Sequence, residues 1–316
     1  MCITFFSINP NKSYKFLLLF NRDEFLSRKT LPLDFHYRKD KAFKEILFYP
    51  LDCTFEGTFL CINIKNGNFC CLLNHNSEAI PFNPNAKLKR GDIPINFCLL
   101  DAERNQWENF FKNLDSTKLN YNGFNILCGN IVNENYFYYT NNYIEEDGIE
   151  IPYKFASSGV YGVSNSFLSG NTIYNTKVNY GKQILEKILS KEDYINEKDF
   201  VYKLFEFMGD KTKLINCDDS ETVYPKLENN FLTAMHDKKI KNYIMSSLFV
   251  NDRVEKIMLE YGTRHTICIL CDYENNLCIY EYFDEIHTDQ EIKNKCYLAE
   301  RSLDKLNEYR FSLKNY

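Results

Sequence analysis

Cysteine at position 2 can bring two reactive groups together on one residue. The initiator methionine is normally removed before a small second residue, and its removal would leave Cys2 with a free α-amine. An α-amine has a pKa of about 7.7–8.0 and a free thiol one of about 8.5, so one residue would supply a nucleophile and a base near neutral pH. This pattern predicts acyl transfer, in which a thiolate attacks an amide and water then hydrolyses the thioester.

The segment Asn21–Glu24 supplies polar side chains that suit such a reaction. The Arg22 guanidinium can stabilise a thiolate, and the Asp23 carboxylate can hold an ammonium or orient an amine. The Asn21 amide can donate to a developing oxyanion. Each feature also has a structural explanation, because a second-position cysteine is often incidental and a polar run of this kind is common in solvated turns.

A β-hairpin is expected to bring these two regions together. The runs 2–8 and 14–20 are rich in apolar, β-branched and aromatic residues, and a turn-forming loop separates them. Antiparallel pairing across this loop places Cys2 opposite Phe20, with a bulge able to move the register by one residue. Residues 21–23, just past the expected strand end, would then cluster around the Cys2 thiol.

The rest of the pattern predicts an α+β fold. Further strands are expected at 58–64, 68–74, 122–129, 135–140, 244–250, 265–271 and 277–283, and helices at 96–112, 179–190, 197–208 and 288–305. Strands in runs with helices in blocks favour two antiparallel sheets covered by helices over a doubly wound parallel sheet. No long linker divides the chain, so one domain over 1–316 is expected.

Composition narrows the class of protein. Hydrophobic residues make up 44% and aromatic residues 16% of the chain, which is enough for a large core. The net charge of −5 is spread without a clustered positive patch, so we expect no nucleic-acid partner. We also expect no signal peptide and no membrane-spanning helix, because the apolar run 16–20 is far below spanning length. The 12 cysteines are expected to be mostly reduced.

Histidine and cysteine spacing does not predict a structural metal site. Cys268 and Cys271 form a C-x-x-C pair, but in a strand an odd separation sends the side chains to opposite faces. The adjacent Cys70 and Cys71 diverge in the same way, so all four are expected to be core thiols. His75, directly after the strand 68–74, is either a solvated loop imidazole or a cleft residue able to ligate an iron porphyrin.

Several short segments together resemble one known family. The opening Met1-Cys2-Ile3 and the later Asn21-Arg22-Asp23-Glu24 resemble the NRDE family, also called the transport and Golgi organisation 2 family. Further segments resemble it in the same order: Glu56-Gly57-Thr58-Phe59-Leu60, Tyr121-Asn122-Gly123-Phe124-Asn125, Tyr161-Gly162-Val163-Ser164-Asn165 and Tyr261-Gly262-Thr263-Arg264. One departure is at 56–61, where the family's Gly-Gly-Thr-Trp-Leu-Gly reads Glu-Gly-Thr-Phe-Leu-Cys.

The resemblance implies a fold and a set of site residues. The family is similar in sequence plan to the N-terminal-nucleophile amidohydrolases that include penicillin V acylase and bile-salt hydrolase, which implies an αββα sandwich. By that likeness Cys2 is the nucleophile and Asp23 positions the amine, while Asn74 and Asn165 serve the oxyanion or the substrate. Arg264 then completes the cleft. The role of Arg22 stays open, because those hydrolases order their arginine, asparagine and aspartate differently.

The resemblance also implies a physiological role. Members of the family are linked to Golgi organisation, protein secretion, mitochondrial and lipid homeostasis, and haem mobilisation. It therefore implies a carrier of haem or another hydrophobic molecule in the cytoplasm, associated with mitochondria or the Golgi, with haem as cargo and no required cofactor. The residues keep a second class open, a cysteine hydrolase of C–N bonds that acts on a small acyl amide.

Overall fold

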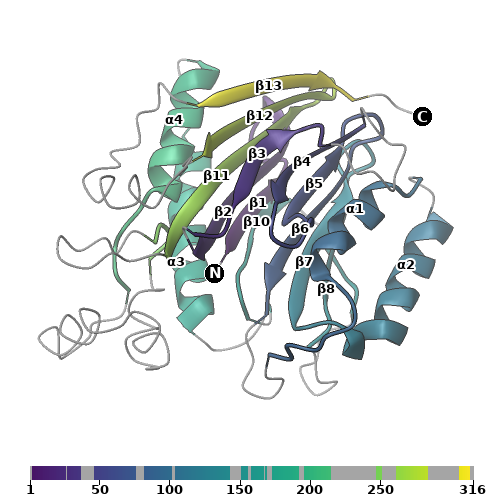
Figure 1. Ribbon diagram of the computed structural model, residues 1–316. Helices are drawn as coiled ribbons and strands as arrows, with labels where there is room; N and C mark the ends of the chain where they lie inside the picture. Colours follow the sequence, from purple (N-terminus) through teal and green to yellow (C-terminus); the bar gives the residue numbers. More distant parts are fainter. Residues whose placement is uncertain are drawn as a thin grey trace, which may run out of the picture.

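Two antiparallel β-sheets lie face to face in the centre of the protein (Figure 1). The computed structural model describes residues 2–25, 27–36, 46–75, 82–101, 104–142, 151–155, 158–166, 168, 173–191, 196–214, 247–250, 261–283 and 306–313. In these ranges the first sheet runs β10 (Gly159–Val163), β1 (Ile3–Ile8), β2 (Tyr14–Phe25), β11 (Tyr261–Asp272), β12 (Asn276–Phe283) and β13 (Asn307–Ser312). The second runs β3 (Thr30–Asp34), β4 (Leu47–Asp52), β5 (Leu60–Asn63), β6 (Asn68–Asn74), β7 (Phe124–Asn130), β8 (Asn135–Thr140) and β9 (Tyr153–Phe155).

Helices cover the outer face of each sheet. The first sheet is covered by α3 (Ile173–Leu189) and α4 (Glu197–Met208), and the second by α1 (Ile93–Cys98) and α2 (Arg104–Thr117), as Figure 1 shows. Short 3-10 turns at Arg90–Asp92 and Lys118–Asn120 precede α1 and follow α2. The order of layers is therefore helix, sheet, sheet, helix. None of the helices in the described ranges is both long enough and apolar enough to span a membrane.

Strand alternation divides the apolar residues into three clusters. One lies between the sheets, one under α3 and α4, and one under α1 and α2. On β11, Cys271 belongs to the cluster between the sheets while Cys268 faces α3 and α4. On β6, Cys71 faces the other sheet while Cys70 faces α1 and α2. All four are fully buried free thiols, which confirms the prediction that these cysteines are core residues.

The predicted α+β class with two antiparallel, helix-covered sheets is confirmed, and several element predictions are corrected. The helix expected at 197–208 is α4, whose N-cap Asn196 side chain accepts a hydrogen bond from the Asp199 backbone N–H. The helix expected at 96–112 is two helices, α1 and α2. The helix expected at 288–305 lies outside the described residues. Strands β3, β4, β9, β10 and β13 were not expected.

The strand expected at 244–250 is wrong over 247–250, the part that the structure describes. These residues are buried but form bends, and their backbone hydrogen bonds go to the loop after α4 and to the start of β11. The Phe249 N–H donates to the carbonyl of Asp210, and the Val250 N–H donates to the Thr263 hydroxyl. A short apolar run can therefore be buried without joining a ladder.

The hairpin of β1 and β2 has a different register from the expected one. Thr4, not Cys2, lies opposite Phe20, because Asn9 takes a left-handed conformation and its N–H donates to the Lys15 carbonyl. A shift of two residues keeps every side chain on its expected face. It also moves the start of the chain toward the polar end of β2.

The polar residues 21–23 lie inside β2, not past its end as expected. Strand β11 pairs with β2 along its whole length, from Tyr261 opposite Phe25 to Asp272 opposite Tyr14. The ladder supplies hydrogen-bond partners for the backbone of this polar segment. Because the segment is a strand, its successive side chains lie on alternate faces of the sheet.

Candidate functional site

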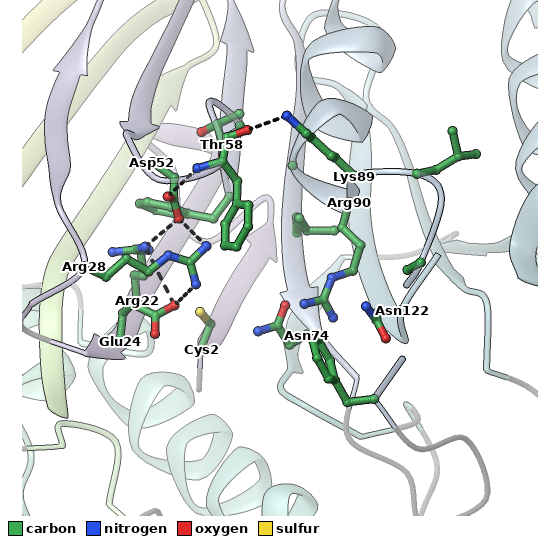
Figure 2. Close-up of a pocket in the computed structure, with 18 of the residues that line it drawn as sticks. Cys2, Arg22, Glu24, Arg28, Asp52, Thr58, Asn74, Lys89, Arg90 and Asn122 are labelled. Carbon is green, nitrogen blue, oxygen red and sulfur yellow. Dashed lines mark hydrogen bonds and ion pairs between the residues drawn. The ribbon is translucent and has the colours of Figure 1, made fainter. Parts of the chain in front are cut away.

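A pocket of about 420 Å³ opens beside Cys2, between strand ends from both sheets (Figure 2). We call it the Cys2 pocket. Its lining includes the end of β2, the end of β4, Phe55 and Gly57–Phe59 of the following loop, the end of β6, and residues between 82 and 91. Its volume falls within the usual range of small-molecule sites, roughly 300–1,000 Å³.

The Cys2 thiol forms part of the pocket wall and is nearly buried, with 8% of the residue exposed. The Cys2 carbonyl accepts a hydrogen bond of 2.9 Å from the Ser164 hydroxyl, which fixes the backbone at this point. Burial raises the pKa of Cys2, whereas the Arg22 charge and a hydrogen bond from the Asp23 backbone lower it. Burial is the largest of these effects, so the protonated thiol is the favoured resting form.

Two arginines and two carboxylates form a partly buried ion-pair network on the Cys2 side of the pocket (Figure 2). Arg22 Nη2 lies 3.1 Å and Arg28 Nη2 lies 2.6 Å from the same Asp52 oxygen. Arg28 Nη1 lies 2.7 Å from Glu24 Oε2, and Arg22 also stacks over the Phe59 ring at 5.1 Å. Each guanidinium therefore has a carboxylate partner, and the network holds Arg22 beside the thiol.

Asp23 also lines the pocket, and its side chain is fixed by β11 and lies in the field of Lys177 on α3. Its Oδ1 accepts a hydrogen bond of 2.6 Å from the Thr263 hydroxyl, and its carbonyl accepts one from Tyr261 Oη. Burial raises the pKa of Asp23, while the positive charge of Lys177 on α3 lowers it. Lys177 is itself fully buried, and burial lowers its pKa. This lysine was not expected from the sequence.

Of the two predicted asparagines, Asn74 lines the pocket, and Asn165 lies next to it and is not among the described lining residues. Asn74 is at the end of β6, and its carbonyl accepts a hydrogen bond from the Asn165 side chain. Asn165 is fully buried directly after Ser164, the residue that holds the Cys2 backbone. The family-derived residues Cys2, Asn74 and Asn165 are thus linked through a short chain of hydrogen bonds.

Asn21 and Arg264 are not among the described residues that line the pocket. The Asn21 amide donates to the carbonyls of Met208 and Leu248, at 2.8 and 3.0 Å. These hydrogen bonds connect β2 to the end of α4 and to the segment 247–250. Arg264 is the extra residue of a bulge in β11, and its Nη1 donates to the Arg28 carbonyl at 2.6 Å. Arg264 therefore fixes the backbone of Arg28, which lines the pocket.

His75 likewise is not one of the described lining residues. Its ring is buried, and Nδ1 lies 3.1 Å from Asn125 Oδ1 and 3.2 Å from the Thr140 hydroxyl. These partners position the imidazole inside the second sheet. Among the described residues no group of three or more histidine, cysteine or acidic side chains is arranged to hold a metal ion.

The wall across from Cys2 contains Lys89 and Arg90, which were not expected from the sequence, and Asn122 of the family-like segment 121–125 (Figure 2). This wall is held against the Asp52 loop by a glycine contact. A Cβ on Gly57 would lie 2.7 Å from the Cα of Gly91, so the two backbones touch where no side chain fits. The Gly91 in Arg-Gly-Asp was the available sequence signal for this contact.

Comparisons with known proteins cover most of the chain. A family model described as Transport and Golgi organisation 2 matches residues 1–283. The cow protein named Transport and Golgi organization protein 2 homolog is 24% identical over 288 residues, covering 89% of this chain and 92% of the relative. The human protein of the same name is 23% identical, and the mouse Transport and Golgi organization 2 homolog is 24% identical, each with the same coverage.

Proposed function

The chain belongs to the transport and Golgi organisation 2 family, and we propose that it carries a hydrophobic small molecule in the Cys2 pocket. The observation that carries this proposal is the apolar rim of the pocket. Phe55, Phe82 and Leu88 all line it, although 54%, 73% and 39% of these residues are exposed. Large apolar side chains exposed together around a cavity are typical of a binding site for an apolar molecule.

Haem is the cargo that we propose to test first. The Cys2 thiol is a pocket group able to ligate haem iron, and the apolar rim suits the porphyrin. In this proposal the protein works in the cytoplasm, associated with mitochondria or the Golgi. Its delivery of cargo then supports Golgi organisation, secretion, and mitochondrial and lipid homeostasis.

Haemin titration of the full chain tests the carrier function. We expect saturable binding with one haemin per chain, seen as a shift of the haem absorption band, and tighter than binding to an unrelated control protein. Cys2→Ala tests whether the thiol is an iron ligand, and Cys53→Ala is the matched control because Cys53 does not line the pocket. Binding no tighter than that of the control protein would rule out haem as the cargo.

A second function is favoured by the grouping of Cys2, Arg22, Asp23 and Asn74 around one cavity. On an N-terminal-nucleophile αββα fold these residues would act as a cysteine hydrolase of amide C–N bonds. The thiolate would attack the carbonyl carbon of a small acyl amide, the amine would leave with a proton, and water would hydrolyse the thioester to the acid and the free thiol. The α-amine of Cys2 would be the base, so this function requires removal of Met1.

Intact mass of protein expressed with its native start shows whether that amine exists. If Met1 is absent, incubation with acyl amides is expected to give a covalent acyl adduct on Cys2 and turnover that Cys2→Ser abolishes. Cys53→Ser should leave turnover unchanged. Retention of Met1, or turnover that persists in Cys2→Ser, would exclude the self-activated nucleophile.

A further inference from the structure

The Cys2 pocket contains positive charge that its own carboxylates do not neutralise. On the Cys2 side, Arg22 and Arg28 share Asp52 and Glu24. On the far side, Arg90 has no ion pair with any carboxylate in the part of the chain that the structure describes. Its recorded hydrogen bond is from Nη1 to the Gly123 carbonyl, at 2.6 Å.

The Arg90 side chain is directed into the pocket. Figure 2 shows its guanidinium beside Asn74 and Asn122, across the cavity from Cys2. Burial, followed by the like charge of Arg28, lowers the pKa of Arg90 to about 10. A cation that is desolvated and repelled by a neighbouring cation gains more from an anionic ligand than an exposed one does.

Exposure increases from the inner wall of the pocket toward its mouth. Cys2 and Arg22 are 8% and 3% exposed, whereas Phe55 and Phe82 are more than half exposed. Leu88, close to Arg90 in the chain, continues this apolar rim. The cavity therefore offers a charged interior behind an apolar mouth, which is complementary to an amphipathic anion.

We propose that Arg90 binds the carboxylate of an amphipathic ligand, whose apolar part lies against Phe55, Phe82 and Leu88. The planar guanidinium suits a carboxylate because it can donate two parallel N–H bonds. The inference rests on the proposed function in that the ligand is the cargo or the amide substrate of this same pocket. It adds the chemical class of that ligand and the residue that selects it.

A pair of alkylating reagents tests the anion preference without any assumption about the natural ligand. Iodoacetate and iodoacetamide differ in their carboxylate, and each joins its methylene carbon to the Cys2 sulfur, with iodide expelled and the thiol proton released to solvent. We expect Arg90→Met to lower the ratio of the iodoacetate to the iodoacetamide rate at Cys2 by about fivefold or more. A change in the Cys2 pKa affects both rates equally and cancels in the ratio. Peptide mapping measures each rate at Cys2 alone.

Binding of a matched ligand pair gives the second measurement. In a Cys2→Ala background, which prevents turnover, we expect N-dodecanoylglycine to bind about tenfold more tightly than the neutral N-dodecanoylglycinamide. Arg90→Met should remove this preference and Arg90→Lys should restore part of it. Arg310→Met, on β13 and not among the lining residues, is the matched control and should keep the full preference.

The outcomes separate the two proposals. If both dodecanoyl compounds bind equally and the alkylation ratio does not change in Arg90→Met, the carboxylate site is wrong while the carrier function survives. If neither compound binds but the alkylation ratio falls as expected, Arg90 selects anions and the amphipathic cargo is wrong. An unchanged ratio together with no binding overturns the carboxylate site, and the haemin titration then decides the carrier function.

Discussion

At the scale of single residues, the buried charge of Lys177 on α3 acts on the buried Asp23 carboxylate of the candidate site. The pKa of Asp23 is raised by burial, so its proton is held more tightly in the folded protein than in the unfolded chain. Its contribution to stability is therefore present at low pH and is lost as the pH rises through the folded pKa. The Lys177 charge opposes this loss.

Lys177→Met is expected to destabilise the protein more at pH 8 than at pH 5. Without the lysine, the ionised carboxylate of Asp23 loses a nearby buried positive charge, which costs roughly 1–3 kcal/mol, whereas the protonated form loses little. Urea unfolding at the two pH values measures the difference. Lys187→Met, an exposed position on the same helix, should show no pH-dependent loss. Equal losses at both pH values would contradict this interaction.

The proximity of some candidate site residues could be predicted from the sequence because they lie on one hairpin. Cys2, Arg22 and Asp23 are joined by local strand geometry, so their proximity follows from the pattern of β1 and β2. Arg28, Asp52 and Arg90 reach the pocket through loops and through contacts between the sheets, which spacing along the chain does not encode. For the same reason, the sequence could not show that the buried Asn21 amide donates to the carbonyls of Met208 and Leu248 and not into the pocket.

At the scale of elements, two adjacent residues in the loop after β4 are expected to respond in opposite ways. Gly57→Ala would place a methyl group 2.7 Å from the backbone of Gly91, so the loops must separate, at a cost of roughly 1–3 kcal/mol. Glu56 has a φ of 55°, where the family pattern has glycine. Glu56→Gly should therefore stabilise the protein by about 1 kcal/mol.

Thermal unfolding of the two variants checks this pair. We expect the melting temperature to fall for Gly57→Ala and to rise for Glu56→Gly relative to the unchanged chain. Alkylation of Cys2 by iodoacetamide should also change in Gly57→Ala, because the separated loops form the pocket wall. A Gly57→Ala protein with unchanged stability would show that the loops move apart without cost.

The helices and strands that could be predicted from the sequence are those with regular apolar periodicity. Long central strands and α4 have regular apolar periodicity, and both were expected from the sequence. Strand β3 reads Thr-Leu-Pro-Leu-Asp and is joined to β4 by three pairs with an irregular register, while β9 has three residues. Short edge strands carry too few residues for alternation to be detected, and tertiary pairing decides their conformation.

At the scale of the whole molecule, a buried acid connects the two sheets. Glu281 on β12 accepts hydrogen bonds from the Leu33 N–H of β3, at 3.2 and 3.0 Å, and its Oε1 lies 2.9 Å from His265 Nδ1. Burial raises the pKa of Glu281 to about 8, while burial and two arginines lower that of His265. For Glu281, a folded pKa above the unfolded one means that its contribution to stability is largest at low pH and is lost as the pH rises toward 8.

Glu281→Gln should reduce this pH dependence, because a glutamine cannot ionise and its amide fills nearly the same space. We expect melting temperatures of the unchanged chain to fall between about pH 5 and pH 8.5, and those of Glu281→Gln to fall less. Glu308→Gln, on the exposed strand β13, is the matched control and should follow the unchanged chain. Parallel curves for all three proteins would show that Glu281 is ionised throughout.

The pairing of β2 with β11 determines when the site can form during synthesis. The Thr263 hydroxyl that fixes Asp23 lies 240 residues further along the chain, so the ribosome releases Cys2 and Asp23 long before their partner exists. At about 5–20 residues per second this interval lasts on the order of ten seconds or more. During that time the nascent chain carries an unprotected thiol and a half-paired central strand, and a chaperone that covers them would protect the site before it can close.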